Sequence, residues 1–190
     1  MDILKELRER RAYRALSPDE LPDGAARRIV EAGTLAPSCY NNQPWRIVAA
    51  EGQSLEALKA ALPEGNAWAT RAPLIIGVAV READDCRLDD GRDYALFDAG
   101  LCAMAMLIQA TAEHLVAHPI AGYNPKKAKA ALGLPSDHTL IALIVVARRG
   151  DPDGEDGKLL AEWQLKSERG ERQRKALDEV AAFGRWPQGR

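Results

Sequence analysis

The sequence predicts an α+β protein, because three short apolar runs of strand length are spaced between at least five helical segments. The runs are residues 45–50, 73–80 and 140–147. The longest helical segment, from Tyr94 to about Leu115, is small and apolar on nearly all sides, so it must lie buried at the centre of the fold. The chain has 190 residues, 46% apolar and 28% charged, which is the length and composition of one globular domain.

Local patterns place the elements in order along the chain. Apolar residues at helical spacing predict helices over residues 2–11, 25–36, 55–62, 94–115 and 125–133. The polar segment 38–44 reads as a loop that leads into the first strand. The second strand is apolar throughout, as a strand buried on both faces should be. His118-Pro119-Ile120-Ala121-Gly122 breaks the long helix and reads as a turn.

The end of the chain forms a separate unit in this reading. Residues 1–165 are predicted as the main domain and residues 166–190 as a C-terminal arm. The tail is highly charged but still carries spaced large apolar groups, among them Trp163, Leu177 and Phe183. A tail of this composition is expected to pack on another surface, such as a second subunit.

Composition excludes several classes of protein. Lysine and arginine number 26 against 28 acidic residues, so the net charge of −2 argues against a nucleic-acid binder. No apolar run approaches the roughly 20 residues that a membrane-spanning helix needs, and the first residues show no secretory leader. The three cysteines, Cys39, Cys86 and Cys102, are odd in number and form no CxxC pair. We therefore expect no disulfide framework, no membrane or nucleic-acid partner, and a cytoplasmic protein.

Common catalytic and nucleotide motifs are missing from the sequence. It contains no GxGxxG, no GxxxxGK[ST] and no GxSxG. His114 and His118 stand four residues apart, but no third metal ligand lies near them. No metal site is predicted, and no side chain is predicted to act as an obligate catalytic acid, base or nucleophile.

Five motifs occur in order along the chain and together resemble the FMN-dependent nitroreductase family. They are RRAYR at 10–14, LAPSCYNNQPW at 35–45, a P-x-x-G turn at 119–122, LGLP at 132–135 and an R-x-R pair at 172–174. The resemblance implies a nitroreductase-like fold, in which a central, mostly antiparallel sheet is wrapped by helices in an intertwined homodimer. It also implies FMN as the cofactor and NADH or NADPH as the reductant.

The implied reaction passes a hydride from NAD(P)H through the flavin to an electron-poor small-molecule acceptor by a ping-pong mechanism. Nitroaromatics, quinones and activated alkenes are candidate acceptors. Other flavin chemistry on the same fold, such as reductive dehalogenation or flavin fragmentation, stays open, as does a flavin-binding protein without turnover. A plain α/β interaction domain is a further alternative.

Candidate cofactor-binding residues follow from the motifs. They are Arg10, Arg11, Ala12, Arg14, Pro37, Ser38, Cys39, Asn41, Gln43, Asn66, Pro119, Ile120, Ala121, Gly122, Arg172 and Arg174. Arginines from the two ends of the chain would neutralise the dianionic phosphate, because guanidinium groups offer charge and bidentate donors. The alternative is that the tail arginines bind no cofactor: they would lie on a solvated helix face and pair with Glu168 and Glu171.

The other candidates would contact the flavin itself. The pyrimidine edge of the ring would form hydrogen bonds with Asn66, Arg10 and the backbone near Ala12. The backbone of residues 119–122 would stack on the ring near its N5 atom. The resemblance implies that residues 37–43 reach the flavin of the partner subunit. Three positions depart from the family pattern, since Ala12 and Cys39 replace common serines and Ala121 replaces a common acid. Cys39 is expected to be a small packing or ribityl-facing residue, not a redox thiol.

The sequence also predicts a homodimer. The central helix offers Leu101, Met104, Leu107 and Ile108 along with small residues that permit close approach of a second helix. The alternative is a monomer in which this helix is fully wrapped.

Overall fold

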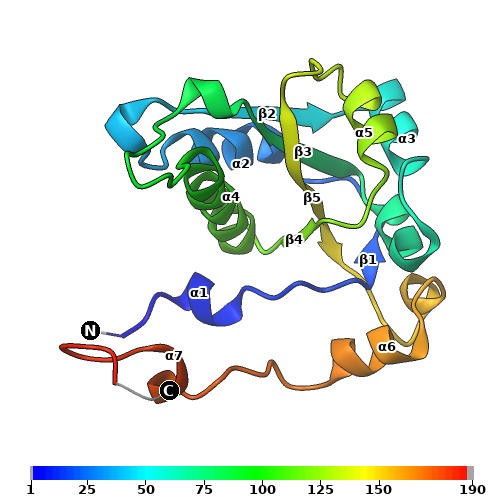
Figure 1. Ribbon diagram of the computed structural model, residues 1–190. Coiled ribbons are helices and arrows are strands. Elements are labelled where there is room, and N and C mark those ends of the chain that lie inside the picture. Colours follow the sequence, from blue (N-terminus) through cyan, green and yellow to red (C-terminus); the bar gives the residue numbers. More distant parts are fainter. Residues whose placement is uncertain (1, 188–190) are drawn as a thin grey trace.

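The computed structural model describes residues 2–187 and has helices on both faces of an antiparallel sheet (Figure 1). Its strands are β1 (Leu16–Ser17), β2 (Trp45–Ala50), β3 (Leu74–Val80), β4 (Val116–Ile120) and β5 (Thr139–Arg149). The long strand β5 pairs with β3 along one edge and with β4 and then β1 along the other, and β2 pairs with β3. All of these pairs are antiparallel, so the predicted α+β fold with a mostly antiparallel sheet is confirmed.

The helices divide between the two faces of the sheet. They are α1 (Lys5–Glu9), α2 (Ala25–Thr34), α3 (Gly52–Lys59), α4 (Ala95–Ala112), α5 (Pro125–Ala131), α6 (Glu162–Arg169) and α7 (Leu177–Val180), with short 3-10 helices η1 (Cys39–Asn41), η2 (Glu64–Arg71), η3 (Glu82–Asp84) and η4 (Glu155–Gly157). Helices α2 and α4 cover one face, while α3, α5 and η2 cover the other (Figure 1). The sheet therefore lies between two apolar cores.

Strand β3 is buried on both faces, as the unbroken apolar run predicts. Every one of its residues is buried. Ile75 and Ala79 point into the core beneath α3 and α5, while Ile76 and Val78 point into the core beneath α2 and α4. This alternation is the period of two that a strand imposes on its side chains.

Helix α4 packs against α2 as closely as side chains allow. A β-carbon on Gly33 of α2 would lie 2.8 Å from the side chain of Met106 in α4, so only glycine fits there. Among residues 2–187, α4 is the one helix whose length and hydropathy would suit a membrane span, and 39% of that span is buried inside the fold. The core helix of a globular protein has the same character.

Two strands were not predicted, and one helix is shorter than expected. The segment before Gly122 is not a simple turn, because residues 116–120 form β4. Pro119 masks this strand in the sequence, but β4 pairs only with β5, and proline is tolerated on such an edge strand. The first helix spans only Lys5–Glu9, and the chain then runs without regular structure from Arg10 to the short strand β1.

The C-terminal arm returns to the beginning of the chain. After α6 it runs beside the N-terminal segment (Figure 1). The guanidinium of Arg11 donates hydrogen bonds to the carbonyl oxygens of Ser167 and Gly170. Arg172 in turn donates to the carbonyl oxygen of Arg10 at 2.9 Å. These hydrogen bonds hold the two ends of the chain together.

Candidate functional site

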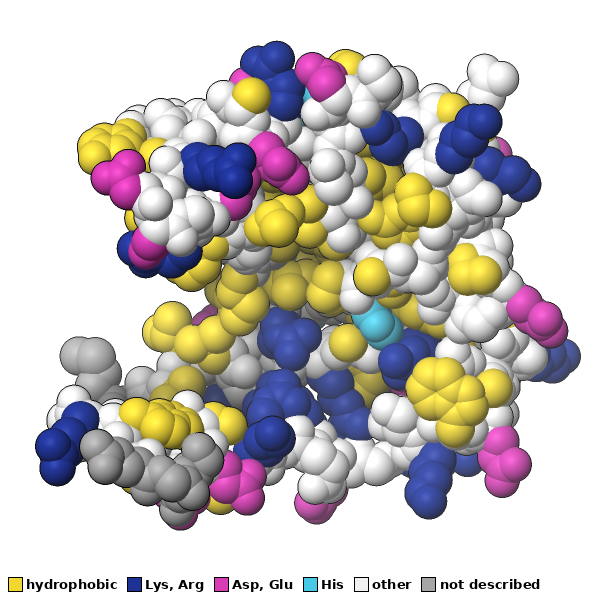
Figure 2. Space-filling view, viewed as in Figure 1, with side chains coloured by type: hydrophobic (Ala, Val, Ile, Leu, Met, Phe, Trp, Pro, Cys, Tyr) yellow, Lys and Arg dark blue, Asp and Glu magenta, His cyan; other side chains and the backbone are white. Residues whose placement is uncertain are grey.

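Arginines from both ends of the chain line one hollow of about 380 Å³. Its walls are Arg10, Arg11, Ala12, Arg14, Ser167, Glu171, Arg172, Gln173 and Arg174. Figure 2 shows dark-blue basic side chains gathered where the chain ends meet the body of the molecule. All six candidates that the sequence predicts in these two segments thus lie together, although more than 150 residues separate them along the chain.

The five arginines of this hollow outnumber its nearby carboxylates, which are Glu171 in its wall and the buried Glu168, whose charge acts on Arg14. Within residues 2–187, none of Arg10, Arg14, Arg172 and Arg174 has an ion pair within 4 Å. Burial lowers the pKa of Arg10, and the neighbouring charges of Arg172 and Arg174 lower it further. Guanidinium groups that repel one another at close range form a site suited to an anion.

The alternative for the tail arginines holds only in part. Arg172 and Arg174 are exposed, but they lie outside any helix, and within residues 2–187 neither pairs with Glu168 or Glu171. Arg172 donates to the carbonyl oxygen of Arg10 and Arg174 to that of its neighbour Gln173. Glu168 is only 4% exposed, and its Oε1 accepts a hydrogen bond from the backbone N–H of Arg14 at 2.7 Å. Glu168 therefore ties α6 to the N-terminal segment that carries the other arginines.

A second group of candidates lies at the end of β4. The side-chain amide of Asn66 donates to the carbonyl oxygen of Gly122 at 2.7 Å. A β-carbon on Gly122 would lie 2.6 Å from the Asn66 Nδ2 atom, so a larger residue there would displace the Asn66 side chain from this contact. Pro119 and Ala121 are exposed beside this contact. Asn66 and the 119–122 segment are therefore neighbours, as the predicted site requires.

Aromatic side chains join this contact to the arginine-lined hollow. The rings of Trp68 and His118 lie with their centroids 4.7 Å apart. The guanidinium of Arg14 lies 6.0 Å from the Trp68 ring centroid and 5.3 Å from that of Trp163, distances at which cation–π attraction operates. Trp68 Nε1 donates to the Asn66 Oδ1 atom at 3.2 Å. The hollow and the Asn66–Gly122 contact thus form one continuous region.

Sequence reasoning missed several residues of this region. Trp68, His118, Trp163 and Glu168 were not among the predicted cofactor-binding residues, although the loops around Trp68 and Trp163 were expected to shape the substrate pocket. Buried Glu168 and His118 sit in sequence among ordinary charged or turn-forming residues, so nothing local distinguishes them. Only the isolated Trp163, in a highly charged segment, offered a clue in the sequence.

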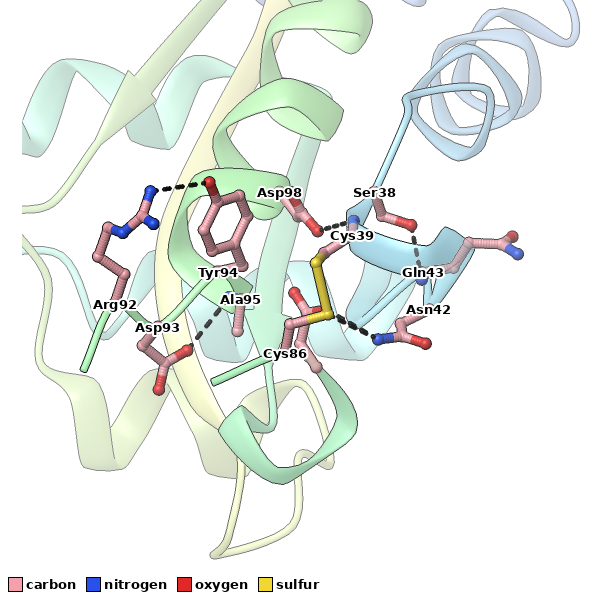
Figure 3. The surroundings of a disulfide bond; sticks show 11 residues. Ser38, Cys39, Asn42, Gln43, Cys86, Arg92, Asp93, Tyr94, Ala95 and Asp98 are labelled. Carbon is pink, nitrogen blue, oxygen red and sulfur yellow. Dashed lines mark hydrogen bonds between the residues drawn. A yellow bond between two sulfur atoms is a disulfide. The ribbon is translucent and has the colours of Figure 1, made fainter. Parts of the chain in front are cut away.

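The candidates between Pro37 and Gln43 do not lie in this region of the same chain. They belong to η1 and its flanks, which are held at the beginning of α4 (Figures 1 and 3). The backbone N–H of Cys39 donates to a carboxylate oxygen of Asp98 at 2.7 Å. The Ser38 Oγ atom accepts from the backbone N–H of Gln43 at 2.9 Å and closes the turn.

Cys39 and Cys86 form a disulfide bond, which the sequence did not predict (Figure 3). Cys39 is therefore paired in this structure, and its predicted role as a small packing or ribityl-facing residue stays a prediction. Cys102 is the remaining cysteine and lies buried in α4, where burial raises the pKa of its thiol to about 12. Cys39, Asp85 and Cys86 are also the one group of metal-ligand type within residues 2–187, but their two sulfur atoms are bonded to each other.

His118 provides a test of the aromatic link through the pH dependence of stability. Burial lowers its pKa to about 4, opposed by its hydrogen bond with the Tyr13 carbonyl oxygen and aided by the charges of Arg14 and Arg10. Between about pH 6.5 and pH 4 the unfolded chain binds a proton that the folded chain does not. The free energy of unfolding should therefore fall as the pH drops through this window, by roughly 3 kcal/mol in total.

Urea unfolding of wild-type protein and of the His118→Asn variant between pH 4 and 7 measures this contribution. Asparagine keeps a donor for the Tyr13 carbonyl oxygen but cannot take up the proton, so the pH dependence should flatten. The matched control is His114→Asn, because His114 is exposed and sits at a φ of 59° that asparagine accepts. Equal slopes for wild type and His118→Asn would contradict the expectation.

Comparisons with known proteins find related sequences. The sequence profile of the nitroreductase family matches residues 7–148. The chain is 32% identical over 137 residues to an uncharacterised 15.4 kDa protein of Mycolicibacterium smegmatis, covering 72% of this chain and 87% of that protein. It is 29% identical over 171 residues to an NADH dehydrogenase of Thermus thermophilus, covering 73% of this chain and 82% of the relative.

Solved structures share the whole fold. A crystal structure described as an oxidoreductase containing FMN has a TM-score of 0.81 at 24% identity and covers 98% of this chain and 94% of its own. A putative nitroreductase from Desulfovibrio desulfuricans, solved in complex with FMN, has a TM-score of 0.71 at 25% identity and covers 96% of both chains. The family profile spans most of the chain, and the fold agrees with it. The chain therefore belongs to the nitroreductase family of flavin oxidoreductases.

Proposed function

We propose that this chain binds FMN in the arginine-lined hollow and the adjoining Asn66–Gly122 region, and uses it to oxidise NADH or NADPH. The electrons go to an electron-poor acceptor such as a nitroaromatic, a quinone or an activated alkene. One observation carries the proposal: four arginines from opposite ends of the chain converge on one hollow, and within residues 2–187 none of them forms an ion pair within 4 Å. The FMN in two similar crystal structures and the name of the Thermus relative support the cofactor and the reductant.

The residues present fit the phosphate end of FMN. A phosphate dianion needs positive charge and several donors, and Arg10, Arg14, Arg172 and Arg174 supply both. The repulsion that lowers the pKa of Arg10 would be relieved by a bound dianion. Arg11 contributes indirectly, because its guanidinium is engaged by the carbonyl oxygens of Ser167 and Gly170 and so holds the arm in place.

The ring end of FMN would lie against the Asn66–Gly122 contact. Asn66 offers an amide, and the adjoining segment exposes Pro119, Ala121 and Gly122 while the Ile120 side chain is buried in the core. Ala12 has no side-chain donor, so that position can serve the flavin only through its backbone. Residues Pro37, Ser38, Cys39, Asn41 and Gln43 would reach the flavin of a second subunit.

The side chains of this region bind and orient; they are not assigned a proton-transfer step. When bound, FMN supplies two-electron transfer between the nicotinamide and the acceptor, which would use the same open face in turn. His118, the titratable side chain nearest the ring end, is buried and neutral at physiological pH, and its Nδ1 atom lies 3.0 Å from the Tyr13 carbonyl oxygen. It is therefore suited to positioning the 10–14 segment.

The visible absorption spectrum of the purified protein tests the proposal first. Bound FMN should give a yellow protein, and anaerobic titration with NADH and with NADPH should bleach it and identify the preferred reductant. Re-oxidation by a nitroaromatic or a quinone under argon then tests turnover. A yellow protein that neither nicotinamide reduces would favour flavin binding without catalysis, and a colourless protein that ignores added FMN would overturn the proposal.

We further propose that the enzyme is a homodimer formed through α2 and α4. An apolar hollow of about 400 Å³ lies between these helices and is lined mainly by Ala32, Leu35, Ala36, Pro37, Leu101, Met104, Ala105 and Ile108. Leu35 is 84% exposed and Met104 37% exposed, which is costly for a surface that stays in water. Pro37 leads directly into the 38–43 turn, so a dimer formed here would carry that turn toward the partner.

The variant Met104→Glu should convert the dimer into a colourless monomer. A carboxylate introduced into the centre of an apolar interface loses its hydration, and both subunits of a symmetric dimer carry the change. Light scattering gives the oligomeric state, and the absorption spectrum gives the bound flavin. Leu159→Glu is the matched control, because Leu159 is a comparably exposed apolar residue outside this face. A yellow Met104→Glu dimer would place the interface elsewhere.

A further inference from the structure

The turn at residues 39–43 is held in a conformation that its own sequence does not favour. Tyr40, Asn41 and Gln43 have φ values of 48°, 58° and 51°, and none of them is glycine. Residues with side chains enter this left-handed region at a cost, so such a turn persists only where its surroundings hold it.

Residues 85–98 supply the contacts that hold this turn from outside. Cys39 is bonded to Cys86, and its backbone N–H donates to Asp98. The Asn42 side chain donates to Asp85 at 3.2 Å and to the Cys86 sulfur at 3.3 Å (Figure 3). The disulfide is the only covalent link between the two segments within the described chain, and it also supplies the sulfur that Asn42 contacts.

Both cysteines of the disulfide lie at the surface of the chain, where a dissolved thiol can reach them. Cys39 and Cys86 are each partly exposed, whereas the third cysteine, Cys102, is fully buried. A single disulfide on the surface of a chain without a disulfide framework is typical of redox-sensitive bonds. The same turn is the segment that the proposed function directs to the flavin of the partner subunit.

We propose that Cys39 and Cys86 form a thiol–disulfide exchange site whose redox state sets the affinity of the enzyme for FMN. The inference rests on the proposed function, since it needs the 38–43 turn to contact flavin. The co-substrate is a dithiol reductant. One of its thiolates attacks a sulfur of the disulfide to give a mixed disulfide, and its second sulfur then displaces the protein thiol. The Cys39–Cys86 bond breaks, two protein thiols form, and the dithiol leaves as a disulfide, so two electrons and two protons reach the protein.

Reduction releases the turn from its strained conformation and lowers the fraction of molecules in which it can meet the flavin. The apparent dissociation constant rises in inverse proportion to that fraction, and we expect a rise of about tenfold. Rates of turnover at saturating FMN need not change, because the switch acts on occupancy.

The experiment compares FMN-free protein in its oxidised form and after reduction with dithiothreitol, which is removed under argon. Thiol titration in denaturant should count one thiol per chain before reduction and three after it. FMN binding, followed by quenching of flavin fluorescence, should weaken about tenfold on reduction. Cys86→Ser should bind weakly in both conditions, and the control Cys102→Ala should respond as wild type does.

Hydrogen exchange separates this inference from the proposed function. The amides of residues 39–43 should exchange faster after reduction and in Cys86→Ser, whether or not FMN is present. If neither form binds FMN, the proposed function fails, and the exchange rates still decide whether the bond controls the turn. Equal FMN affinities in verified oxidised and reduced protein, equal exchange rates, or three thiols in protein treated with an oxidant would each overturn the inference.

Discussion

Replacing both tail arginines, as Arg172→Ala with Arg174→Ala, should weaken FMN binding by roughly a hundred- to ten-thousandfold and give colourless protein. Each charge-assisted hydrogen bond to a phosphate contributes roughly 1.5–3 kcal/mol, and both arginines line the hollow. Arg172 also fastens the arm to the Arg10 carbonyl oxygen, so its loss loosens the wall of the site as well. The measurement is FMN titration of the FMN-free variant, together with its melting temperature.

The matched control for this pair is Lys175→Ala. This change removes one positive charge from the same exposed segment, and Lys175 does not line the hollow. Its FMN affinity should stay within a few-fold of wild type, and added FMN should still raise its melting temperature. Truncation before Glu171 should reproduce the double variant. Flavin retained by the truncated protein through dialysis would show that the tail does not hold the phosphate.

Loss of the Cys39–Cys86 bond should lower the free energy of unfolding of FMN-free protein by roughly 4 kcal/mol. The two cysteines stand 47 residues apart, and the bond restricts the unfolded chain by closing a loop of that length. In a protein of this size, such a change lowers the melting temperature by about 8–16 °C.

Urea unfolding of oxidised wild type and of Cys86→Ser measures this difference, which concerns global stability and is separate from FMN affinity. Wild type unfolded in dithiothreitol should match Cys86→Ser, and the variant should not respond to the reductant. A difference below about 1 kcal/mol would mean that the bond only tightens a loop that is already closed in the unfolded ensemble.

Features encoded over short stretches of sequence were predictable. The apolar run of β3 and the apolar helix α4 both form where their patterns place them. Strand β3 is buried on both faces as expected, whereas α4 buries one side in this chain and leaves Leu96, Phe97 and Met104 exposed. The convergence of Arg10 and Arg172 was also predictable, but only because the motifs resembled a family whose site joins both ends of the chain. Periodicity alone would have left the tail arginines on a solvated face.

Features that depend on distant segments were not predictable. Pro119 hid β4, because a proline within five residues reads as a break until the neighbouring strand is known. The pairing of Cys39 with Cys86 depends on how the turn after α2 meets the loop before α4, and the spacing of two cysteines carries no such information. The stack of Trp68 on His118 likewise arises from the contact between η2 and β4.

The hydrogen bonds that join the two ends of the chain have a consequence for biosynthesis. Arg10 and Arg14 leave the ribosome first, while Arg172, Arg174 and the carbonyl group of Gly170 that holds Arg11 are made last. A nascent chain can pair all five strands of its sheet once residue 149 has emerged, since β5 finishes at Arg149. It cannot complete the arginine-lined hollow until residues 167–174 have also emerged, so cofactor loading would follow synthesis of that segment. A chain that stopped between these two points would form the sheet but lack at least one of the tail arginines that line the hollow.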